Sequence, residues 1–209
     1  MKILSSIQNP ELKKLRLLFQ KARERKKLAL FVIEGKREIQ KAIRGGYSFE
    51  SVFIHEEAIG DFESLLNSVD HVTKYSLEAS LFEKLSIRSG SEKIIAIAHN
   101  KPHDLSQLKL NKNSIVLVIE APEKPGNIGA ILRTADAANV DAVIIANPKT
   151  DLYNPNIIRS SVGCVFTNTI ATGTTNEIIT FLKEQKILPN QTDNFLRSLE
   201  INTSKVLPT

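Results

Sequence analysis

The sequence has 209 residues, of which 42% are hydrophobic and 24% are charged, so the chain can bury a sizeable core and form one or two domains. This composition excludes a disordered or collagen-like chain, and the single cysteine, Cys164, excludes a scaffold held by internal disulfides. No apolar run approaches the roughly 20 residues that cross a membrane, so we expect a cytoplasmic protein with no membrane partner.

The formal net charge of +5 is distributed unevenly along the chain. Residues 1–44 contain 13 Lys and Arg against 4 Asp and Glu, whereas residues 45–209 contain 15 against 19. A basic segment of this kind can bind a polyanion, because each phosphate that it neutralises releases counterions. Charge alone leaves a second interpretation open, in which these side chains form the solvated face of a helix.

The first predicted element is a basic amphipathic helix. It begins at Asn9-Pro10, with Asn9 as the N-cap and Pro10 at the first helical position. Apolar residues then recur at helical spacing, at Leu12, Leu15, Leu18, Phe19 and Ala22. Basic residues occupy much of the remaining surface, at Lys13, Lys14, Arg16, Lys21, Arg23 and the run Arg25-Lys26-Lys27.

Strands and helices alternate over the rest of the first half. In chain order we predict an apolar run over 28–33, a helix over 36–44 stopped by Gly45-Gly46, a strand over 51–55, a helix over 61–67, a short run over 71–75, a helix over 76–85 and an apolar run over 93–99. This order predicts a small α/β domain over residues 1–99. Residues 100–113 are polar and lack a clear period, which predicts a linker.

The second predicted domain, residues 114–209, has a regular order of strand, loop and helix. We predict a buried strand over 114–119, a helix that ends at about Asn139, a strand over 141–146, a helical turn through Arg159, an apolar run over 165–170 and a helix over 175–185. This order predicts a parallel sheet whose ligands bind at the carboxyl ends of the strands. The predicted fold class is therefore α/β.

The segment Gly126-Asn127-Ile128-Gly129 stands where a predicted strand leads into a helix. Free backbone N–H groups and the positive end of the helix make such a place suitable for an anion. The two glycines are equally compatible with tight packing between elements. The segment is neither a Walker loop nor a GxGxxG fingerprint, which argues against nucleotide hydrolysis and hydride transfer.

A second donor-rich segment strengthens the prediction of a binding site. Arg133 follows Gly129 by about one helical turn, so it can lie near the crevice at the strand ends. The loop and helical turn after the next strand contain Lys149, Arg159, Ser160 and Ser161. Together these residues supply many hydrogen-bond donors and almost no general acids, a combination that suits a phosphate and a ribose.

Other reactive side chains favour structural roles. The four histidines show no ligand spacing and the chain has one cysteine, so the sequence predicts no metal site. Cys164 lies in an apolar run without a partnered base, which favours a place in the core over a role as nucleophile.

These motifs resemble the SpoU, or TrmH-like, family of RNA ribose methyltransferases in the SPOUT superfamily. In the second half the resemblance is carried by Asn127-x-Gly129-x-x-x-Arg133, Asn147-Pro148-Lys149 and Arg159-Ser160-Ser161-x-Gly163. In the first half it is carried by Asn9-Pro10, Phe31-Val32-Ile33-Glu34-Gly35, Phe82-Glu83-Lys84-Leu85 and Ile94-Ile95-Ala96-Ile97. It covers residues 9 to about 186 and implies a small substrate-binding domain joined to a parallel-sheet domain of the α/β knot type.

The resemblance implies transfer of a methyl group from S-adenosylmethionine to a ribose 2′-hydroxyl of rRNA or tRNA. It implies catalytic roles for Asn127 and Arg133. Because a guanidinium stays protonated, Arg133 is better suited to stabilise a developing alkoxide or to hold a phosphate than to act as a base. The resemblance also implies RNA binding by Gly129, Lys149, Arg159, Ser160, Ser161 and Glu34, and it favours RNA contact for the basic helix, with Lys13, Lys14 and Arg23.

The C-terminal motifs of the family are not recognisable in this sequence. A full member continues with a strand, a glycine and glutamate loop, an Ile-Pro loop and a Ser-Leu-Asn segment, which tie the knot and form the cofactor pocket; here the pattern is lost after about Lys186. We therefore assign no cofactor-binding residues and expect an incomplete, truncated or frameshifted SPOUT domain. A catalytically inactive RNA-binding remnant stays open as an alternative, and the homodimer that the resemblance implies would lack part of its interface.

Overall fold

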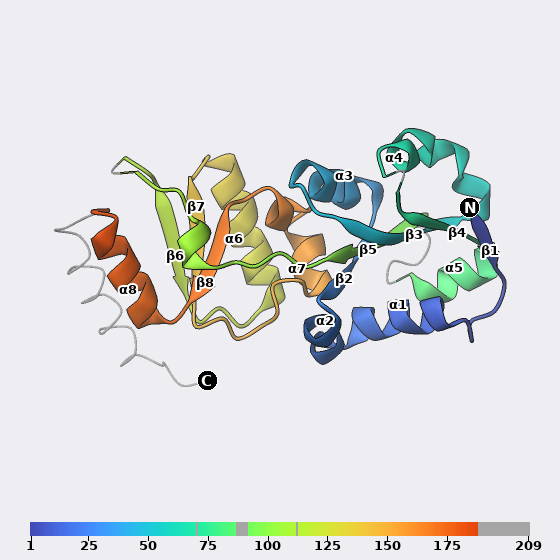
Figure 1. Ribbon diagram of the computed structural model, residues 1–209, viewed down its shortest axis with the longest axis horizontal. Coiled ribbons are helices and arrows are strands. Elements are labelled where there is room, and N and C mark those ends of the chain that lie inside the picture. The colour runs from blue at the N-terminus through green and yellow to red at the C-terminus, as the bar shows by residue number, and fades with distance from the viewer. Residues whose placement is uncertain (70, 87–91, 112, 188–209) are drawn as a thin grey trace. The chain divides into compact units, whose positions relative to one another are not determined.

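The computed structural model describes residues 1–69, 71–86, 92–111 and 113–187 (Figure 1). The predicted loss of the family motifs after residue 186 falls almost entirely on residues 188–209, which lie outside the described residues. The chain forms two compact units. Unit 1 contains Met1–Pro102, Glu123–Ala138 and Lys149–Asn168, and unit 2 contains His103–Pro122, Asn139–Pro148 and the segment from Thr169 onward.

Unit 1 is built on a mixed five-stranded sheet in the order β1-β4-β3-β5-β2. The strands are β1 (Lys2–Leu4), β2 (Leu30–Glu34), β3 (Phe49–His55), β4 (Thr73–Leu77) and β5 (Ile94–His99). Strands β1, β4 and β3 run parallel, whereas β5 pairs antiparallel with both β3 and β2. The predictions over 51–55 and 93–99 are confirmed as β3 and β5, which have continuous apolar runs because both are almost entirely buried.

Seven α-helices of the described chain belong to unit 1. They are α1 (Pro10–Gln20), α2 (Ala22–Leu28), α3 (Lys36–Arg44), α4 (Glu63–Asn67), α5 (Ala79–Leu85), α6 (Pro125–Ala137) and α7 (Pro155–Ser160). The prediction of a helix over 36–44 is confirmed at both ends. Asn9 caps α1 as predicted, because its side chain accepts a hydrogen bond from the backbone N–H of Glu11 at 2.9 Å. Over the described segments, no helix is both long and apolar enough to span a bilayer.

The prediction of one continuous basic helix is wrong. Lys21 has extended backbone angles (φ −121°, ψ 109°) and separates α1 from α2. Leu12, Leu15 and Leu18 are buried as predicted, but Ala22, beyond the break, is exposed. The break lets the Arg25 guanidinium reach the carbonyls of Leu18 and Phe19, which lie at the end of α1 and have no partner within the helix.

Four aromatic side chains form a cluster in unit 1: Phe31, Tyr47, Tyr153 and Phe166. Phe31 stacks on Tyr153 with 4.2 Å between ring centroids, and the two tyrosine hydroxyls lie 3.2 Å apart. Burial and the neighbouring Tyr47 hydroxyl raise the pKa of Tyr153. The cluster packs residues 149–168 onto the N-terminal sheet, so these residues share a unit with residues 1–102 although the sequence predicted separate domains over 1–99 and 114–209.

Replacing Phe31 with alanine is expected to lower the free energy of unfolding by about 3–5 kcal/mol, because the ring is fully buried and stacks with two other aromatic rings. Urea unfolding followed by circular dichroism measures this loss. The control is Leu17→Ala on α1, where the side chain is 39% exposed and a change within about 0.5 kcal/mol is expected. Equal losses for the two variants would contradict the importance of the cluster.

Unit 2 is built on a parallel three-stranded sheet in the order β6-β7-β8, in agreement with the α/β prediction. The strands are β6 (Val116–Glu120), β7 (Ala142–Ala146) and β8 (Ile170–Gly173). Helix α8 (Thr175–Glu184) begins with a capping box between Thr174 and Glu177, and its apolar side packs against β7. Strand β8 begins at the end of the apolar run predicted over 165–170, because Cys164–Phe166 form a 3₁₀ turn instead.

The segment predicted as a linker, residues 100–113, contributes to the core of unit 2. Leu108 is buried, and Leu105 and Leu110 pack against the same core. The backbone N–H of Thr172 donates to the carbonyl of His103 at 2.7 Å, which attaches the segment to β8. These three leucines are spaced three and two residues apart in a segment that is mostly polar. The segment shows no clear helical or strand period, so the sequence did not predict that they are buried.

Candidate RNA-binding and catalytic site

All residues that the sequence singled out for catalysis or RNA binding lie in unit 1. Helix α6 contains Asn127, Gly129 and Arg133, and helix α7 contains Arg159 and Ser160. Their mutual arrangement is therefore set within one compact unit, together with the basic helices α1 and α2. The carboxyl ends of the parallel strands β6, β7 and β8 belong to unit 2.

Helices α6 and α7 cross in close contact at Gly129. A Cβ atom added to Gly129 would lie 2.6 Å from the backbone carbon of Ser160 and 2.6 Å from the backbone nitrogen of Ser161. Gly129 is buried, so its function in this structure is to let the two helices approach. Of the two interpretations that the sequence left open, the geometry favours tight packing over direct contact with a substrate.

The same contact fixes Arg133. Its side chain is exposed, and Nη1 donates to the backbone carbonyl of Ser160 at the end of α7. A guanidinium carries five N–H groups, so the remaining donors can serve an RNA phosphate or a developing alkoxide. Asn127 lies in the first turn of α6 and is also exposed, and α6 therefore presents both predicted catalytic side chains at its surface.

The loop before α7 is fixed by its own side chains. Asn154 caps α7 by accepting from the backbone N–H of Asn156 at 2.9 Å, and Pro155 occupies the first helical position. After the helix, Gly163 adopts a left-handed conformation (φ +75°) that favours glycine. The motif Arg159-Ser160-Ser161-x-Gly163 thus forms the end of α7 and the turn that follows it, and it also contributes surface donors.

The two predicted substrate-binding serines, Ser160 and Ser161, form hydrogen bonds inside the protein. Ser161 is fully buried; its hydroxyl donates to the carbonyl of Ile158 at 3.0 Å and accepts from the backbone N–H of Val165 at 3.4 Å. This burial favours stabilisation of the end of α7 over the contact with RNA that the family resemblance implies for Ser161. Ser160 is half-buried, and its hydroxyl lies 2.6 Å from the carbonyl of Asn156. Ser160 contacts the predicted catalytic Arg133 through its backbone carbonyl, which accepts a hydrogen bond from the guanidinium.

Arg159 and Glu34, which are far apart in the sequence, line the same pocket of unit 1. The other lining residues are Phe19, Val32, Pro155, Asn156 and Ile158. Glu34 also accepts a hydrogen bond from the hydroxyl of Ser86. The structure therefore joins two residues that the family resemblance named separately, one from α7 and one from the end of β2.

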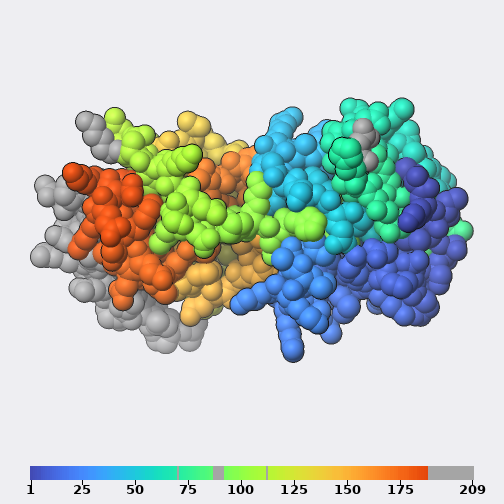
Figure 2. Space-filling view, viewed as in Figure 1, coloured from blue at the N-terminus to red at the C-terminus, as the bar shows by residue number. Residues whose placement is uncertain are grey.

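The basic face of α1 and α2 is defined by exposed cations: Lys13, Arg16, Lys21, Arg23, Lys26 and Lys27. Figure 2 shows the N-terminal segment that includes α1 and α2 in blue. Lys14 differs, because its ammonium lies 2.5 Å from Glu50 and 2.8 Å from Glu11. Burial alone would lower the pKa of Lys14, but the hydrogen bonds to these two carboxylates outweigh that effect and raise it. Lys14 is thus already paired within the protein.

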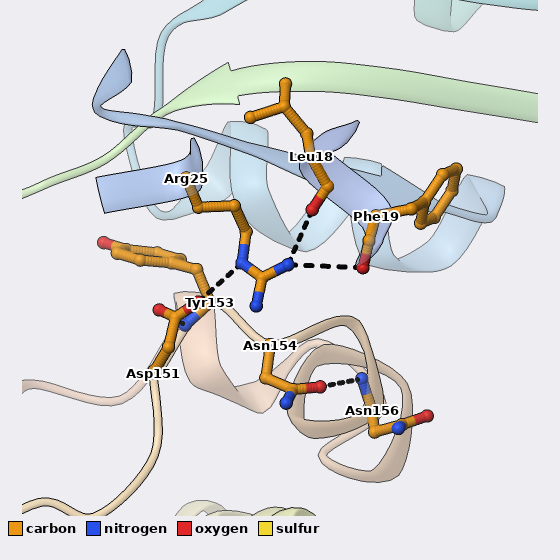
Figure 3. A network of polar contacts seen from close by, with 7 residues as sticks. All are labelled: Leu18, Phe19, Arg25, Asp151, Tyr153, Asn154 and Asn156. Atoms are coloured by element: carbon orange, nitrogen blue, oxygen red, sulfur yellow. Dashed lines mark hydrogen bonds and ion pairs between the residues drawn. The ribbon is translucent and has the colours of Figure 1, made fainter. Parts of the chain in front are cut away.

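Among the basic residues of this segment, Arg25 is one that the sequence placed wrongly. It was grouped with the solvated run Arg25-Lys26-Lys27, yet its side chain is only 3% exposed and pairs with Asp151 at 2.5 Å (Figure 3). The available signal was spacing, since Arg25 follows Leu18 by seven residues and so lies on the same side of an ideal helix. Asp151, between Thr150 and Leu152 in the loop, carried no signal at all.

The strand ends of unit 2 carry a separate polar cluster. The Asn147 amide donates to Glu120 and to the hydroxyl of Thr175, both at 2.7 Å, and this hydroxyl donates to the second Glu120 oxygen at 2.9 Å. Ala121 and Asn147, each directly after a strand, adopt left-handed conformations with φ of 43° and 45°. The cluster joins β6, β7 and the start of α8 at the edge where parallel sheets bind ligands.

The structure places Cys164 in the core, as predicted. Its side chain is 4% exposed, and its sulfur lies 3.0 Å from the Lys41 ammonium. Within residues 1–69, 71–86, 92–111 and 113–187, no three His, Cys, Asp or Glu side chains are grouped so as to hold a metal ion.

The chain matches two known protein families in separate segments. Residues 114–205 match the SpoU rRNA methylase family, and residues 9–96 match the MRM3-like substrate binding domain. The chain is 29% identical over 168 residues to the 23S rRNA (guanosine(2553)-2′-O)-methyltransferase RlmP of Bacillus subtilis (strain 168), a match that covers 79% of this chain and 63% of the relative. The chain thus spans less than two thirds of that relative.

Solved structures give the same result. A crystal structure of an RNA 2′-O ribose methyltransferase is 31% identical, with a TM-score of 0.72 over 88% of this chain and 70% of the other. The AdoMet-bound rRNA methyltransferase from Sinorhizobium meliloti is 21% identical, with a TM-score of 0.78 over 88% of this chain and 69% of the other, and it supports the fold. The resemblance predicted from the motifs is confirmed.

Proposed function

Because the chain belongs to the SpoU family of RNA ribose methyltransferases, we propose that it transfers a methyl group from S-adenosylmethionine to a ribose 2′-hydroxyl of rRNA in the cytoplasm. The observation that carries the proposal is the α6–α7 junction, where a carbonyl of α7 holds the exposed guanidinium of Arg133. The MRM3-like match over residues 9–96 supports RNA binding by the N-terminal part.

S-adenosylmethionine is chemically compatible with the polar cluster of unit 2. Its ribose hydroxyls and amino groups need carboxylate, amide and hydroxyl partners, which Glu120, Asn147 and Thr175 provide at the strand ends. These three residues would hold one side of the cofactor. When bound, the cofactor supplies an electrophilic methyl carbon on a sulfonium.

The residues of unit 1 account for the handling of RNA. The basic face of α1 and α2 attracts the phosphate backbone and places the strand without reading its sequence. Arg133 would hold the phosphate beside the target ribose or stabilise charge that develops on the 2′-oxygen, and Asn127 would help orient the sugar. Lys149 and Arg159 would add contacts to neighbouring phosphates.

Titration calorimetry with S-adenosylmethionine, followed by a tritium-transfer assay on unmodified 23S rRNA, tests the proposed function. Binding of the cofactor and incorporation of a methyl group at a 2′-hydroxyl are expected. RNA binding without cofactor heat or methyl transfer would identify the chain as an RNA-binding protein without catalysis. Absence of both cofactor and RNA binding would refute the proposal as a whole.

RNA affinity is expected to fall at least tenfold between 50 and 200 mM salt, because displaced counterions drive the binding. Replacing Lys13 and Arg23 by glutamine is expected to reduce the slope of log affinity against log salt by about one for each contact that is lost. Filter binding with a structured rRNA fragment measures both effects. Lys183→Gln removes one positive charge from an exposed position of α8, serves as the control for each single substitution and is expected to leave the slope unchanged. A slope near zero for the original protein would argue against the basic face as the RNA contact.

A further inference from the structure

Arg25 is a buried cation with three acceptors around it. Its Nε donates to Asp151 at 2.5 Å, and its Nη1 donates to the carbonyls of Leu18 and Phe19 at 2.6 and 3.2 Å (Figure 3). A guanidinium that is 3% exposed is retained only where such partners compensate for lost hydration. Arg25 thus attaches the end of α1 to the loop that precedes α7.

Asp151 transmits this attachment to α7. While one carboxylate oxygen binds Arg25, the other accepts the backbone N–H of Tyr153 at 3.0 Å. The Asp151 carbonyl accepts the backbone N–H of Asn154 at 3.0 Å, and Asn154 caps α7. The first turn of α7 is therefore built directly on the residue that Arg25 holds.

The other end of α7 holds Arg133. The carbonyl of Ser160 accepts from Arg133, and Gly129 packs beneath Ser160. Contacts thus run without interruption from α1 through Arg25, Asp151 and the six residues of α7 to the guanidinium of Arg133. Every member of this chain of contacts belongs to unit 1.

We propose that Arg25 is a positioning residue of the methyltransferase. Through Asp151 it fixes α7, and with it the Arg133 guanidinium, at a set distance from the basic face that binds RNA. Arg23, which belongs to the basic face, lies two residues from Arg25 on the same helix. The helix that contacts RNA is therefore the one that positions the Arg133 guanidinium through Arg25. This inference rests on the proposed function. The position of the guanidinium matters because a substitution far from the reacting atoms that misplaces a catalytic group by about 1 Å can lower the rate about 100-fold.

The test uses Asp151→Asn in the full chain. Asparagine keeps the size of the side chain and an oxygen for the Tyr153 N–H, but it removes the charge that faces Arg25. Asp61→Asn is the matched control, because Asp61 is exposed in the 3₁₀ turn Gly60–Phe62 and outside the site. Arg25→Lys provides the reciprocal change, since it keeps the positive charge and loses the planar fork.

Hydrogen exchange of α7 is the readout that does not require activity. The amide of Ser161, which donates to the carbonyl of Ile157 at 2.8 Å, is expected to exchange at least tenfold faster in Asp151→Asn and Arg25→Lys, with β3 and β5 unchanged. The control Asp61→Asn is expected to leave both regions unchanged. Unchanged exchange in α7, or equal acceleration throughout unit 1, would overturn the proposal.

Kinetics and RNA binding provide the second readout. At saturating RNA, Asp151→Asn is expected to lower kcat by about 10- to 100-fold while KM for RNA changes less than about threefold, because the basic face is intact. In RNA binding, Arg133→Ala is expected to cost less affinity in the Asp151→Asn background than in the original protein. A change in KM alone, or full additivity of the two substitutions, would overturn the positioning role. Failure of the original chain to bind RNA would refute the proposed function instead, while exchange still decides whether Arg25 fixes α7.

Discussion

Replacing Arg133 with alanine is expected to lower the rate of RNA methylation by at least about 100-fold, because the guanidinium that α6 exposes is removed from the reacting ribose. The side chain is exposed and its single described bond goes to a carbonyl of Ser160, so the fold is expected to survive the change. A single-turnover assay with saturating S-adenosylmethionine and rRNA measures the chemical step without product release.

Two further variants separate the guanidinium from simple positive charge. Arg133→Lys is expected to retain part of the activity, since lysine keeps the charge but cannot bind a phosphate through two parallel N–H groups. Arg44→Ala, at the exposed end of α3, removes a cation elsewhere in unit 1 and is expected to leave the rate unchanged. Activity in Arg133→Ala equal to that of the original protein would remove Arg133 from the site.

Replacing Gly129 with alanine is expected to lower the free energy of unfolding by about 2–3 kcal/mol, an effect typical of overpacking in a closely packed core. The new methyl group would lie 2.6 Å from backbone atoms of Ser160 and Ser161, which cannot move aside as the end of a flexible side chain could. Helix α7 must therefore shift, and the bond between Ser160 and Arg133 shifts with it. Urea unfolding measures the loss of stability, and methylation is expected to fall in parallel.

Gly126 provides an internal control three residues earlier in the same helix. A Cβ atom added there meets no other atom within 4 Å, so Gly126→Ala is expected to be neutral or to stabilise the protein by about 0.5 kcal/mol through the lower entropy of its unfolded chain. The two substitutions are chemically identical, but only the one at Gly129 is expected to destabilise the protein. Equal effects would show that helix propensity, rather than the contact with α7, determines the cost at Gly129.

Local signals in the sequence were sufficient for several elements. Asn9-Pro10 predicted the start of α1, and the glycine pair after Arg44 predicted the end of α3. Such features depend on neighbours within about one helical turn, which the sequence displays directly. The break at Lys21 and the core residues of the segment 100–113 depend on contacts with distant elements, and the sequence pattern missed both.

The same distinction applies to the candidate site. The residues in the family motifs were identified from sequence, but their division into surface and interior was not. Ser161 and Gly129 were grouped with substrate-binding residues and prove to be buried, while Arg159 and Glu34 line one pocket. A motif records which residues occur together without separating those that contact a ligand from those that hold the backbone in place.

The sequence by itself determined the α/β class and the family, because periodicity and motif spacing are properties of neighbouring residues, and the catalytic role of Arg133 stays a prediction from the family resemblance. Only the tertiary structure decided that Arg25 is buried against Asp151 and that α7 links this ion pair to Arg133. Arg25 and Asp151 are 126 residues apart along the chain, and Arg133 and Ser160 are 27 residues apart. No local sequence pattern specifies contacts between residues that are so far apart.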